Sequence, residues 1–202
     1  MEKILTVITG ASGALYAKKF IEIINKLDKK QTIIISNPGK EVLKHELNDK
    51  FPRGNEEILS FIKAEWDLPR PNLLEIAAVD SFNSPVASGS NAADFMVVIP
   101  CTMGSAARFA QGISTNLIER TFDVMLKEKK KIIIVPRECP LNQIHLENLL
   151  KLSQLGVDII PAMPAFYQKP ESISDLGDFL VGRVLDHLGI KHSLYKKWNG
   201  SK

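Results

Sequence analysis

The sequence is poor in cysteine: its 202 residues include only Cys101 and Cys139. Two cysteines cannot support a disulfide-rich scaffold, and these two are not spaced as paired metal ligands. We therefore expect free thiols and no metal centre. Reduced thiols are typical of cytoplasmic proteins, so we predict a cytoplasmic location.

The sequence also lacks long apolar runs and a strong charge bias. No apolar stretch approaches the roughly 20 residues that span a bilayer, and the amino terminus lacks the apolar core of a signal peptide. We therefore expect no membrane segment. The 26 basic and 23 acidic residues leave a net charge of +3, which argues against nucleic-acid binding.

What the sequence does contain is an alternation of apolar runs and amphipathic stretches. Its length and 45% hydrophobic content suit one domain with a sizeable core, predicted to span 1–202. Runs that are apolar at consecutive positions are typical of strands buried on both faces. Such runs occupy 4–9, 32–37, 94–100, 131–136 and, more weakly, 157–162, and residues with helical spacing occupy 14–27, 115–128, 145–155 and 174–188.

This alternation predicts a single α/β domain with a doubly wound parallel sheet in three layers, a Rossmann-like (flavodoxin-like) arrangement. Two stretches fit it poorly. Residues 48–70 are polar with scattered aromatics, and we expect a short helix and loops there. Residues 81–91 are rich in Ser, Asn, Gly and Pro, and a loop of this length is either disordered or a binding loop.

Small hydroxyl residues and glycines follow the predicted strands. Ligands of open α/β sheets bind outside the carboxyl ends of the strands. Backbone amides at the start of a helix, glycines that allow close approach and the paired N–H donors of an arginine are all suited to binding a phosphate there. The turn at 10–13 lacks the third glycine and the ribose-binding acid of a dinucleotide site, so FMN fits better than NAD. The segments concerned are Gly-Ala-Ser-Gly at 10–13, Ser-Asn-Pro-Gly at 36–39, Cys-Thr-Met-Gly-Ser at 101–105, Arg-Glu-Cys-Pro at 137–140 and Met-Pro-Ala-Phe-Tyr at 163–167.

Each of these features also has a purely structural interpretation. A turn bracketed by glycines is often simply a tight connection between a strand and a helix. Thr102 and Ser105 fit as helix caps, Cys101 fits as a small buried apolar residue, and His145 fits as a structural residue at a helix start. The coincidence of all these features at strand ends favours a binding site.

Several longer motifs carry a resemblance to a known family. They are TGASGALYA, VASGS, MVVIPCTMGS, NLIERTFDVMLKE, VPRECPLNQIHLENLLKLS and PAFYQKP with DFLVGRVLDHLGI. The sequence resembles the flavin prenyltransferases, the UbiX-type flavoproteins. The resemblance implies an FMN-binding homo-oligomer, a trimer or dodecamer, that joins a dimethylallyl group from dimethylallyl monophosphate to N5 and C6 of reduced FMN without a metal. It also implies that the prenylated FMN serves a UbiD-type decarboxylase.

The resemblance assigns roles to individual residues. Positive charges around a departing phosphate stabilise it, and a carboxylic acid can donate a proton to it. The implied FMN contacts are Gly10, Ala11, Ser12, Ser36, Thr102, Met103, Gly104, Ser105 and Arg137. The implied prenyl-phosphate contacts are Tyr167, Arg183, Lys127, Arg120 and Arg137. The implied catalytic residues are Ser12, Glu46, Lys127 and Glu138.

Three departures from the family pattern lead to expectations of their own. Thr102 and Ser105 stand where the family usually has other hydroxyl residues, so the contact is kept. Phe122 replaces a small residue, which we expect to alter subunit packing. The segment 37–39 replaces a more helix-like one, which weakens the prediction of a phosphate or ribityl contact beside Ser36.

Two other functions remain open. A cysteine-type FMN-dependent decarboxylase of the same superfamily would be expected to have a catalytic histidine after an early strand and a Pro-x-Met-Asn motif, whereas 161–164 reads Pro-Ala-Met-Pro. A non-catalytic flavin carrier or accessory subunit of a decarboxylase needs no second phosphate site. An enzyme is therefore favoured by the presence of Lys127, Arg137, Glu138, Tyr167 and Arg183.

Overall fold

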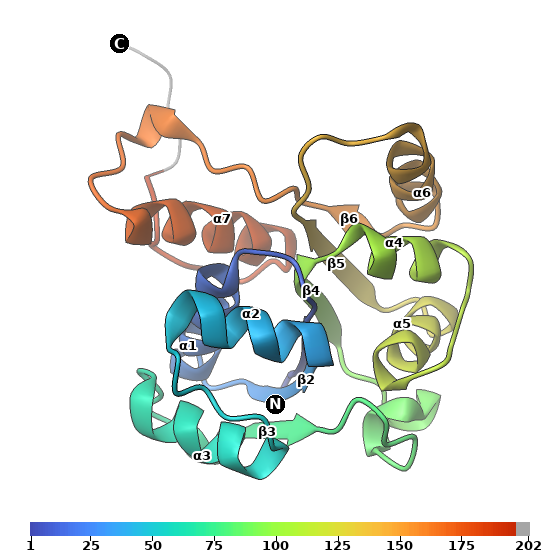
Figure 1. Cartoon of the computed structure of the whole chain (residues 1–202), viewed down its shortest axis with the longest axis horizontal. Coiled ribbons are helices and arrows are strands. Elements are labelled where there is room, and N and C mark those ends of the chain that lie inside the picture. Colours follow the sequence, from blue (N-terminus) through green and yellow to red (C-terminus); the bar gives the residue numbers. More distant parts are fainter. Residues whose placement is uncertain (197–202) are drawn as a thin grey trace.

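Six parallel strands form one sheet in the computed structural model, which describes residues 1–196 (Figure 1). Their apolar runs are buried on both sides because helices cover both faces of the sheet. The single doubly wound α/β fold predicted from the sequence is confirmed. The strands are β1 (Lys3–Ile8), β2 (Lys30–Ile35), β3 (Leu74–Ala77), β4 (Phe95–Cys101), β5 (Lys131–Pro136) and β6 (Asp158–Ile159).

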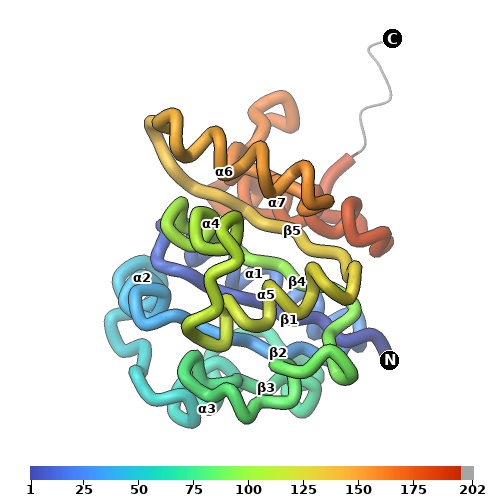
Figure 2. Tube along the Cα trace, turned by 90° about the vertical axis from the view of Figure 1, so that its right-hand side faces the viewer, coloured from blue at the N-terminus to red at the C-terminus, as the bar shows by residue number. Residues whose placement is uncertain are grey.

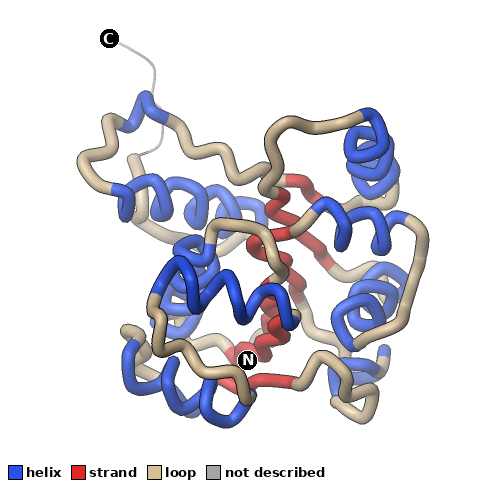
Figure 3. The backbone as a smooth tube through the Cα atoms, in the orientation of Figure 1, coloured by secondary structure: helices blue, strands red, loops and turns tan. Residues whose placement is uncertain are grey.

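Helices form the two outer layers, as Figure 3 shows on either side of the strands. Side chains of α1, α2, α3 and α7 pack on one face, and those of α4, α5 and α6 pack on the other. Figure 2 shows α4, α5 and α6 in front of the sheet. The helices are α1 (Ala14–Lys26), α2 (Asn37–Leu47), α3 (Asn55–Glu65), α4 (Met103–Ala110), α5 (Leu117–Lys127), α6 (Gln143–Gln154) and α7 (Ile173–His187).

The strand order places a topological switch point between β1 and β4. The order is β3-β2-β1-β4-β5-β6, so the chain winds outward from β1 and then returns to its other side. Thr9 joins the carboxyl ends of these two strands, because its hydroxyl donates to Pro100 O at 2.9 Å and accepts from Thr102 N at 2.8 Å. A crevice at such a reversal is where this fold binds ligands.

Two strand predictions were incomplete. Strand β3 was not predicted, because it is a four-residue edge strand with an exposed Glu75 and lies close to Pro69 and Pro71. The last strand, predicted over 157–162, is reduced to β6. The ladder continues beyond it through Ile160 N to Ile134 O at 3.0 Å and Ala162 N to Pro136 O at 2.9 Å.

The expectation of a less helical segment at 37–39 was wrong. Helix α2 starts directly at Asn37, and Ser36 caps it by accepting a hydrogen bond from Gly39 N at 3.0 Å. Proline is compatible with the first turn because its missing N–H has no partner there, so Pro38 does not delay the helix.

The loop predicted at 81–91 is present and contains two short 3₁₀ turns, Pro85–Ala87 and Gly89–Asn91. It packs against α5, where Ala87 O accepts a hydrogen bond from Arg120 Nε at 3.2 Å. Within residues 1–196, no helix combines the length and apolarity needed to cross a membrane. The predicted domain range of 1–202 extends past the described residues.

Phe122, which we expect to alter subunit packing, is buried within its own chain. Its side chain is 1% exposed within the single chain. The ring stacks on Phe109 with centroids 4.0 Å apart and an interplanar angle of 1°. Phe122 therefore fills the space between α4 and α5, and its effect on subunit packing stays a prediction.

Candidate functional site

A cavity of about 360 Å³ opens at the switch point. This volume lies within the range of about 300–1,000 Å³ typical of small-molecule sites. Four of the predicted FMN contacts line it, namely Gly10, Ser36, Thr102 and Ser105. The structure thus brings together residues from the ends of β1, β2 and β4.

Three helices begin at the wall of this cavity. Ser36 caps α2, Thr102 caps α4 by accepting from Ser105 N at 3.1 Å, and Asn116 caps α5 by accepting from Glu119 N at 3.1 Å. All three caps line the cavity. The first-turn amides and the positive ends of the helix dipoles therefore converge on one space, which favours an anionic ligand.

The turn at 10–13 is shaped by its glycines. A Cβ at Gly10 would lie 2.5 Å from the Cβ of Pro38, and Gly13 has φ of +121°, which L side chains rarely adopt. The amides of Gly13 and Ala14 donate to the carboxylate of Glu46 at 2.9 and 2.8 Å. The carboxylate of Glu46 therefore occupies the start of α1. A phosphate is better accommodated at the starts of α2, α4 and α5.

Ser12, Glu46 and Arg137 lie together beside this turn. Partial burial acts to raise the pKa of Glu46, but hydrogen bonds from the Ser12 hydroxyl and the turn amides, together with the charge of Arg137, hold it below its ordinary value. Arg137 is fixed at the rim by its backbone N–H, which donates to Cys101 O at 3.2 Å. Ser12 and Glu46 are thus neighbours beside the turn, and their roles in proton movement stay predictions.

Ala11, Met103 and Cys101 have side chains buried in the core, with exposures of 3%, 4% and 0%. The first two can contact a ligand at the rim mainly through their backbone. The full burial of Cys101 confirms its interpretation as a buried apolar residue, and it raises the pKa of the thiol to about 12. His145 takes part in a capping box of α6: its backbone N–H donates to Asn142 Oδ1 at 2.9 Å, and its Nδ1 accepts from Asn142 N at 3.4 Å. These bonds support the prediction of a structural role.

Tyr167 and Arg183 come together in a second group over α7. The ring of Tyr167 lies 5.9 Å from that of Phe179, and Arg183 Nη1 donates to Asp186 Oδ2 at 3.2 Å and to Tyr195 Oη at 3.4 Å. Tyr195 Oη in turn donates to Asp186. The Tyr195 hydrogen bond, followed by the nearby acidic groups, raises the pKa of Arg183, so its charge is firmly retained.

Arg120 and Lys127 are not brought to the cavity within one chain. Helix α5 starts beside the cavity and ends at Lys127, shortly before β5 begins at the opposite edge of the sheet. A Cβ at Gly89 would lie 2.7 Å from Lys127 Nζ, so this lysine faces the 81–91 loop. Both side chains share the loop-facing side of α5, as their spacing of seven residues predicts.

Glu138 follows β5 on the same side of the sheet as Arg137. Its carboxylate accepts a hydrogen bond from Cys139 N at 3.1 Å. Within residues 1–196, no group of three or more His, Cys, Asp and Glu side chains is placed to hold a metal ion.

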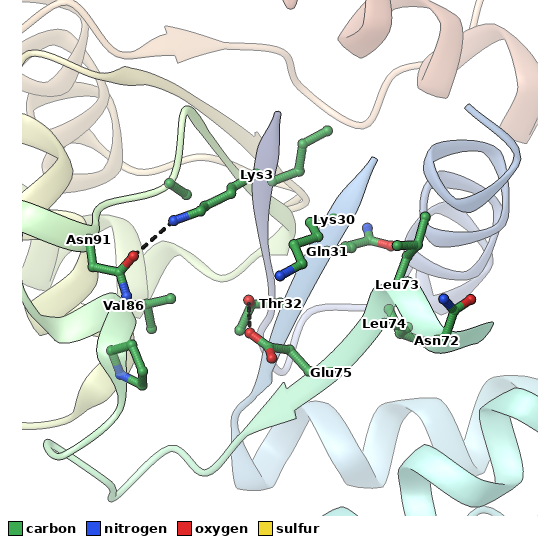
Figure 4. Close-up of a pocket in the computed structure, with 13 residues that line it drawn as sticks. Lys3, Lys30, Gln31, Thr32, Asn72, Leu73, Leu74, Glu75, Val86 and Asn91 are labelled. Carbon is green, nitrogen blue, oxygen red and sulfur yellow. Dashed lines mark hydrogen bonds between the residues drawn. The ribbon is translucent and has the colours of Figure 1, made fainter. Parts of the chain in front are cut away.

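A second cavity, of about 320 Å³, lies at the amino ends of the strands (Figure 4). Two pairs of its polar groups bond to one another: Lys3 Nζ donates to Asn91 Oδ1 at 2.8 Å, and Thr32 Oγ1 donates to Glu75 Oε1 at 2.6 Å. Among the described residues, the buried Gln31 Oε1 in its wall has no hydrogen-bond partner. This cavity lies at the edge opposite the switch point. The cavity at the carboxyl ends is therefore the better candidate.

Sequence reasoning missed several residues that line the candidate site. Thr9, Arg108, Asn116 and Glu119 all lie in its wall. The pair Asn116 and Glu119 has the spacing of a helix cap and its third residue, which could have revealed the start of α5. No sequence signal joins Arg108 to Glu119, because they belong to different helices.

Residues 1–185 match the family described as Flavoprotein. A flavin prenyltransferase UbiX from Methanocaldococcus jannaschii is 45% identical over 196 residues, which cover 97% of this chain and 98% of that protein. The chain belongs to the flavin prenyltransferase family. Membership agrees with the resemblance found in the sequence motifs.

Solved structures of UbiX and UbiX-like proteins are also similar to this chain in fold. AnUbiX in complex with FMN and dimethylallyl pyrophosphate has a TM-score of 0.87 and 35% identity, covering 100% of this chain and 99% of that one. A dodecameric FMN-dependent UbiX-like decarboxylase from Escherichia coli O157:H7 has a TM-score of 0.85 and 32% identity, covering 98% of this chain and 100% of that one. A PPC decarboxylase with 15% identity and a TM-score of 0.59 is similar in fold alone.

Proposed function

We propose that this protein is a flavin prenyltransferase that binds reduced FMN and joins a dimethylallyl group to it. The observation that carries the proposal is the cavity at the switch point, where three helix starts and several hydroxyls face a single space. Its place and chemistry suit a flavin mononucleotide, in a chain whose relatives have this activity. Residues 1–202 act as one FMN-binding domain in this proposal.

Within this proposal, FMN contacts come from Gly10, Ala11, Ser12, Ser36, Thr102, Met103, Gly104, Ser105 and Arg137. Glu46 and Ser12 take part in proton movement at the flavin, which is supported by their position side by side at the turn that follows β1. Glu138 supplies a proton to the departing phosphate.

The allylic donor is dimethylallyl monophosphate in our proposal. Tyr167 and Arg183 hold its phosphate, supported by their shared cluster over α7 and by the retained charge of Arg183. No metal is required, because arginine and lysine charges stabilise the leaving phosphate. One solved neighbour contains dimethylallyl pyrophosphate, so both donors belong in the assay.

We also infer a homo-oligomer, either a trimer or a dodecamer. Arg120 and Lys127 lie away from the cavity of their own chain, so their implied substrate contacts require the cavity of a second copy. Helix α6 has a strongly apolar exposed surface, with Leu146 54% and Leu150 60% exposed. The solved E. coli neighbour is dodecameric, which supports a second copy of this chain as the occupant of that surface.

The prenylated FMN is consumed by a UbiD-type decarboxylase in our proposal, and the protein acts in the cytoplasm. Among residues 1–196, Cys101 and Cys139 are both free, as a reducing compartment would produce.

The decisive experiment is anaerobic. Purified protein is incubated with chemically reduced FMN and either dimethylallyl monophosphate or pyrophosphate, and the flavin is examined by mass spectrometry. We expect the flavin to gain the mass of one five-carbon unit with the monophosphate. The matched variant Arg183→Ala is expected to keep bound FMN but to form much less product.

An unchanged flavin mass with both donors would contradict the proposal. If FMN still bound under those conditions, the flavin-carrier alternative would be favoured. If Arg183→Ala lost FMN before it lost turnover, the division of the two phosphate sites would be wrong. The cysteine-decarboxylase alternative is not favoured, because such proteins match this chain at low identity and in fold alone.

A further inference from the structure

We propose that Arg108, held in place by Glu119, is a further FMN-binding residue and contacts the phosphate of the flavin. The inference rests on the proposed FMN function and adds a residue that the sequence motifs did not assign. Both side chains line the cavity at the switch point, although they come from different helices, α4 and α5.

Glu119 is a buried anchor. Its residue is 2% exposed, and its two carboxylate oxygens are both used. Oε1 accepts from Arg108 Nε at 2.6 Å, and Oε2 accepts from Thr115 N at 2.7 Å and Thr115 Oγ1 at 2.6 Å. Burial acts to raise the pKa of Glu119, but the Thr115 and Arg108 hydrogen bonds hold it below its ordinary value, so the carboxylate remains charged.

Among residues 1–196, Arg108 is anchored on one side only. A guanidinium carries five N–H donors, and the bond to Glu119 uses the single Nε donor. The side chain is 46% exposed. A Cβ at Gly104 would lie 3.7 Å from Nη1, so this end of the guanidinium lies over the first turn of α4. The Nη donors are thus held beside the amides and hydroxyls that begin that helix.

This placement suits a phosphate monoester better than a neutral ligand. A phosphate monoester carries a charge of about −1.5 to −2 at neutral pH and is bound well by the paired donors of arginine. Glu119 lines the same cavity and would repel such an anion if its charge were not balanced. Arg108 therefore both binds the phosphate and neutralises the carboxylate that positions it.

The test compares two flavins that differ only in the phosphate. Binding of FMN and of riboflavin to flavin-free protein is followed by fluorescence titration, for the natural protein and for Arg108→Gln. We expect the dissociation constant for FMN to rise about 10- to 100-fold, as for loss of a hydrogen bond to a charged group, while that for riboflavin changes by less than about two-fold. The dependence of FMN binding on salt should also weaken.

Two further variants make the test sharp. Arg108→Gln combined with Glu119→Gln removes the unbalanced carboxylate, so FMN affinity should recover in part. Arg53→Gln removes an exposed arginine that pairs with Glu41 elsewhere on the surface and should leave both affinities unchanged. If Arg108→Gln does not fold, as judged by circular dichroism, Arg108→Lys is scored by the same FMN-to-riboflavin ratio.

Equal losses for FMN and riboflavin would show a structural role and overturn the inference, as would an unchanged FMN affinity. A natural protein that binds FMN with this selectivity but forms no prenylated product would overturn the proposed activity alone. A natural protein that binds no FMN would overturn both.

Discussion

At the scale of single residues, the charged groups of the site are held by hydrogen bonds to residues of other helices. Glu46 reaches back from the end of α2 to the start of α1, and Glu119 reaches across from α5 to α4. Each carboxylate has a pKa below its ordinary value because amide, hydroxyl or arginine donors stabilise its charged form. Both therefore stay ionised at neutral pH and orient their donors.

We expect Glu119→Gln to lower the free energy of unfolding by about 2 kcal/mol at neutral pH, because a buried charged hydrogen-bond acceptor is lost. The pKa of Glu119 is depressed in the folded state, so its contribution is full above the ordinary value of 4.5 and is lost as pH falls through the folded value. Urea unfolding at several pH values should show the natural protein and the variant converging in acid.

The control for this prediction is Glu147→Gln, on the exposed surface of α6. That variant should follow the natural protein at every pH. If the difference in free energy of unfolding between Glu119→Gln and the natural protein stayed constant down to acid pH, the assigned role of the carboxylate charge would be contradicted.

At the scale of elements, helix α4 connects the site to the core. Its first turn lines the cavity with Thr102 and Ser105, and its later turns bury Phe109 against Phe122 of α5. A stacked pair of buried rings fixes the separation of the two helices that bring Arg108 and Glu119 together. Packing in the core and geometry in the site are therefore coupled through two short helices.

We expect Phe122→Ala to lower the free energy of unfolding by about 3–5 kcal/mol, because it leaves a cavity beside Phe109. Phe82→Ala, at a side chain that is 49% exposed, should change it by less than about 0.5 kcal/mol. Both values come from urea denaturation curves. Similar losses for the two variants would show that the stacked pair does not support the packing of α4 on α5.

At the scale of the whole molecule, the carboxyl and amino ends of the strands carry different groups. The carboxyl edge brings together the starts of three helices, several hydroxyls and the Ser12, Glu46 and Arg137 group. At the amino edge, Lys3 pairs with Asn91 and Thr32 pairs with Glu75. Arg120 and Lys127 extend from α5 away from the cavity of their own chain. In our proposal these residues complete the site of a second copy, and the exposed apolar side chains of α6 suit such an assembly.

We expect the double variant Leu146→Glu and Leu150→Glu to form smaller assemblies than the natural protein, because two charges replace exposed apolar side chains on α6. Molar mass from light scattering after size-exclusion chromatography measures this directly. Lys151→Glu, on the polar side of the same helix, should assemble normally. Natural protein that remained monomeric at micromolar concentration would contradict the inferred homo-oligomer.

The sequence alone was sufficient for the fold class, for four of the long strands and for most helices, because apolar periodicity reports burial directly. It also determined the family, through motifs that span nearly the whole chain. It did not predict the edge strand β3, which has too few buried residues to produce a pattern. It misjudged Asn37-Pro38-Gly39, where the cap from Ser36 decides that a helix begins.

Only the tertiary structure decided which side chains share a site. Residues distant in sequence become neighbours when parallel strands place their carboxyl ends at one edge, and this arrangement joined Ser12 to Glu46 and Arg137. It also paired Arg108 with Glu119 and separated Lys127 from the cavity of its own chain. Local periodicity determines which elements form, but contacts between elements depend on their packing, which no local pattern encodes.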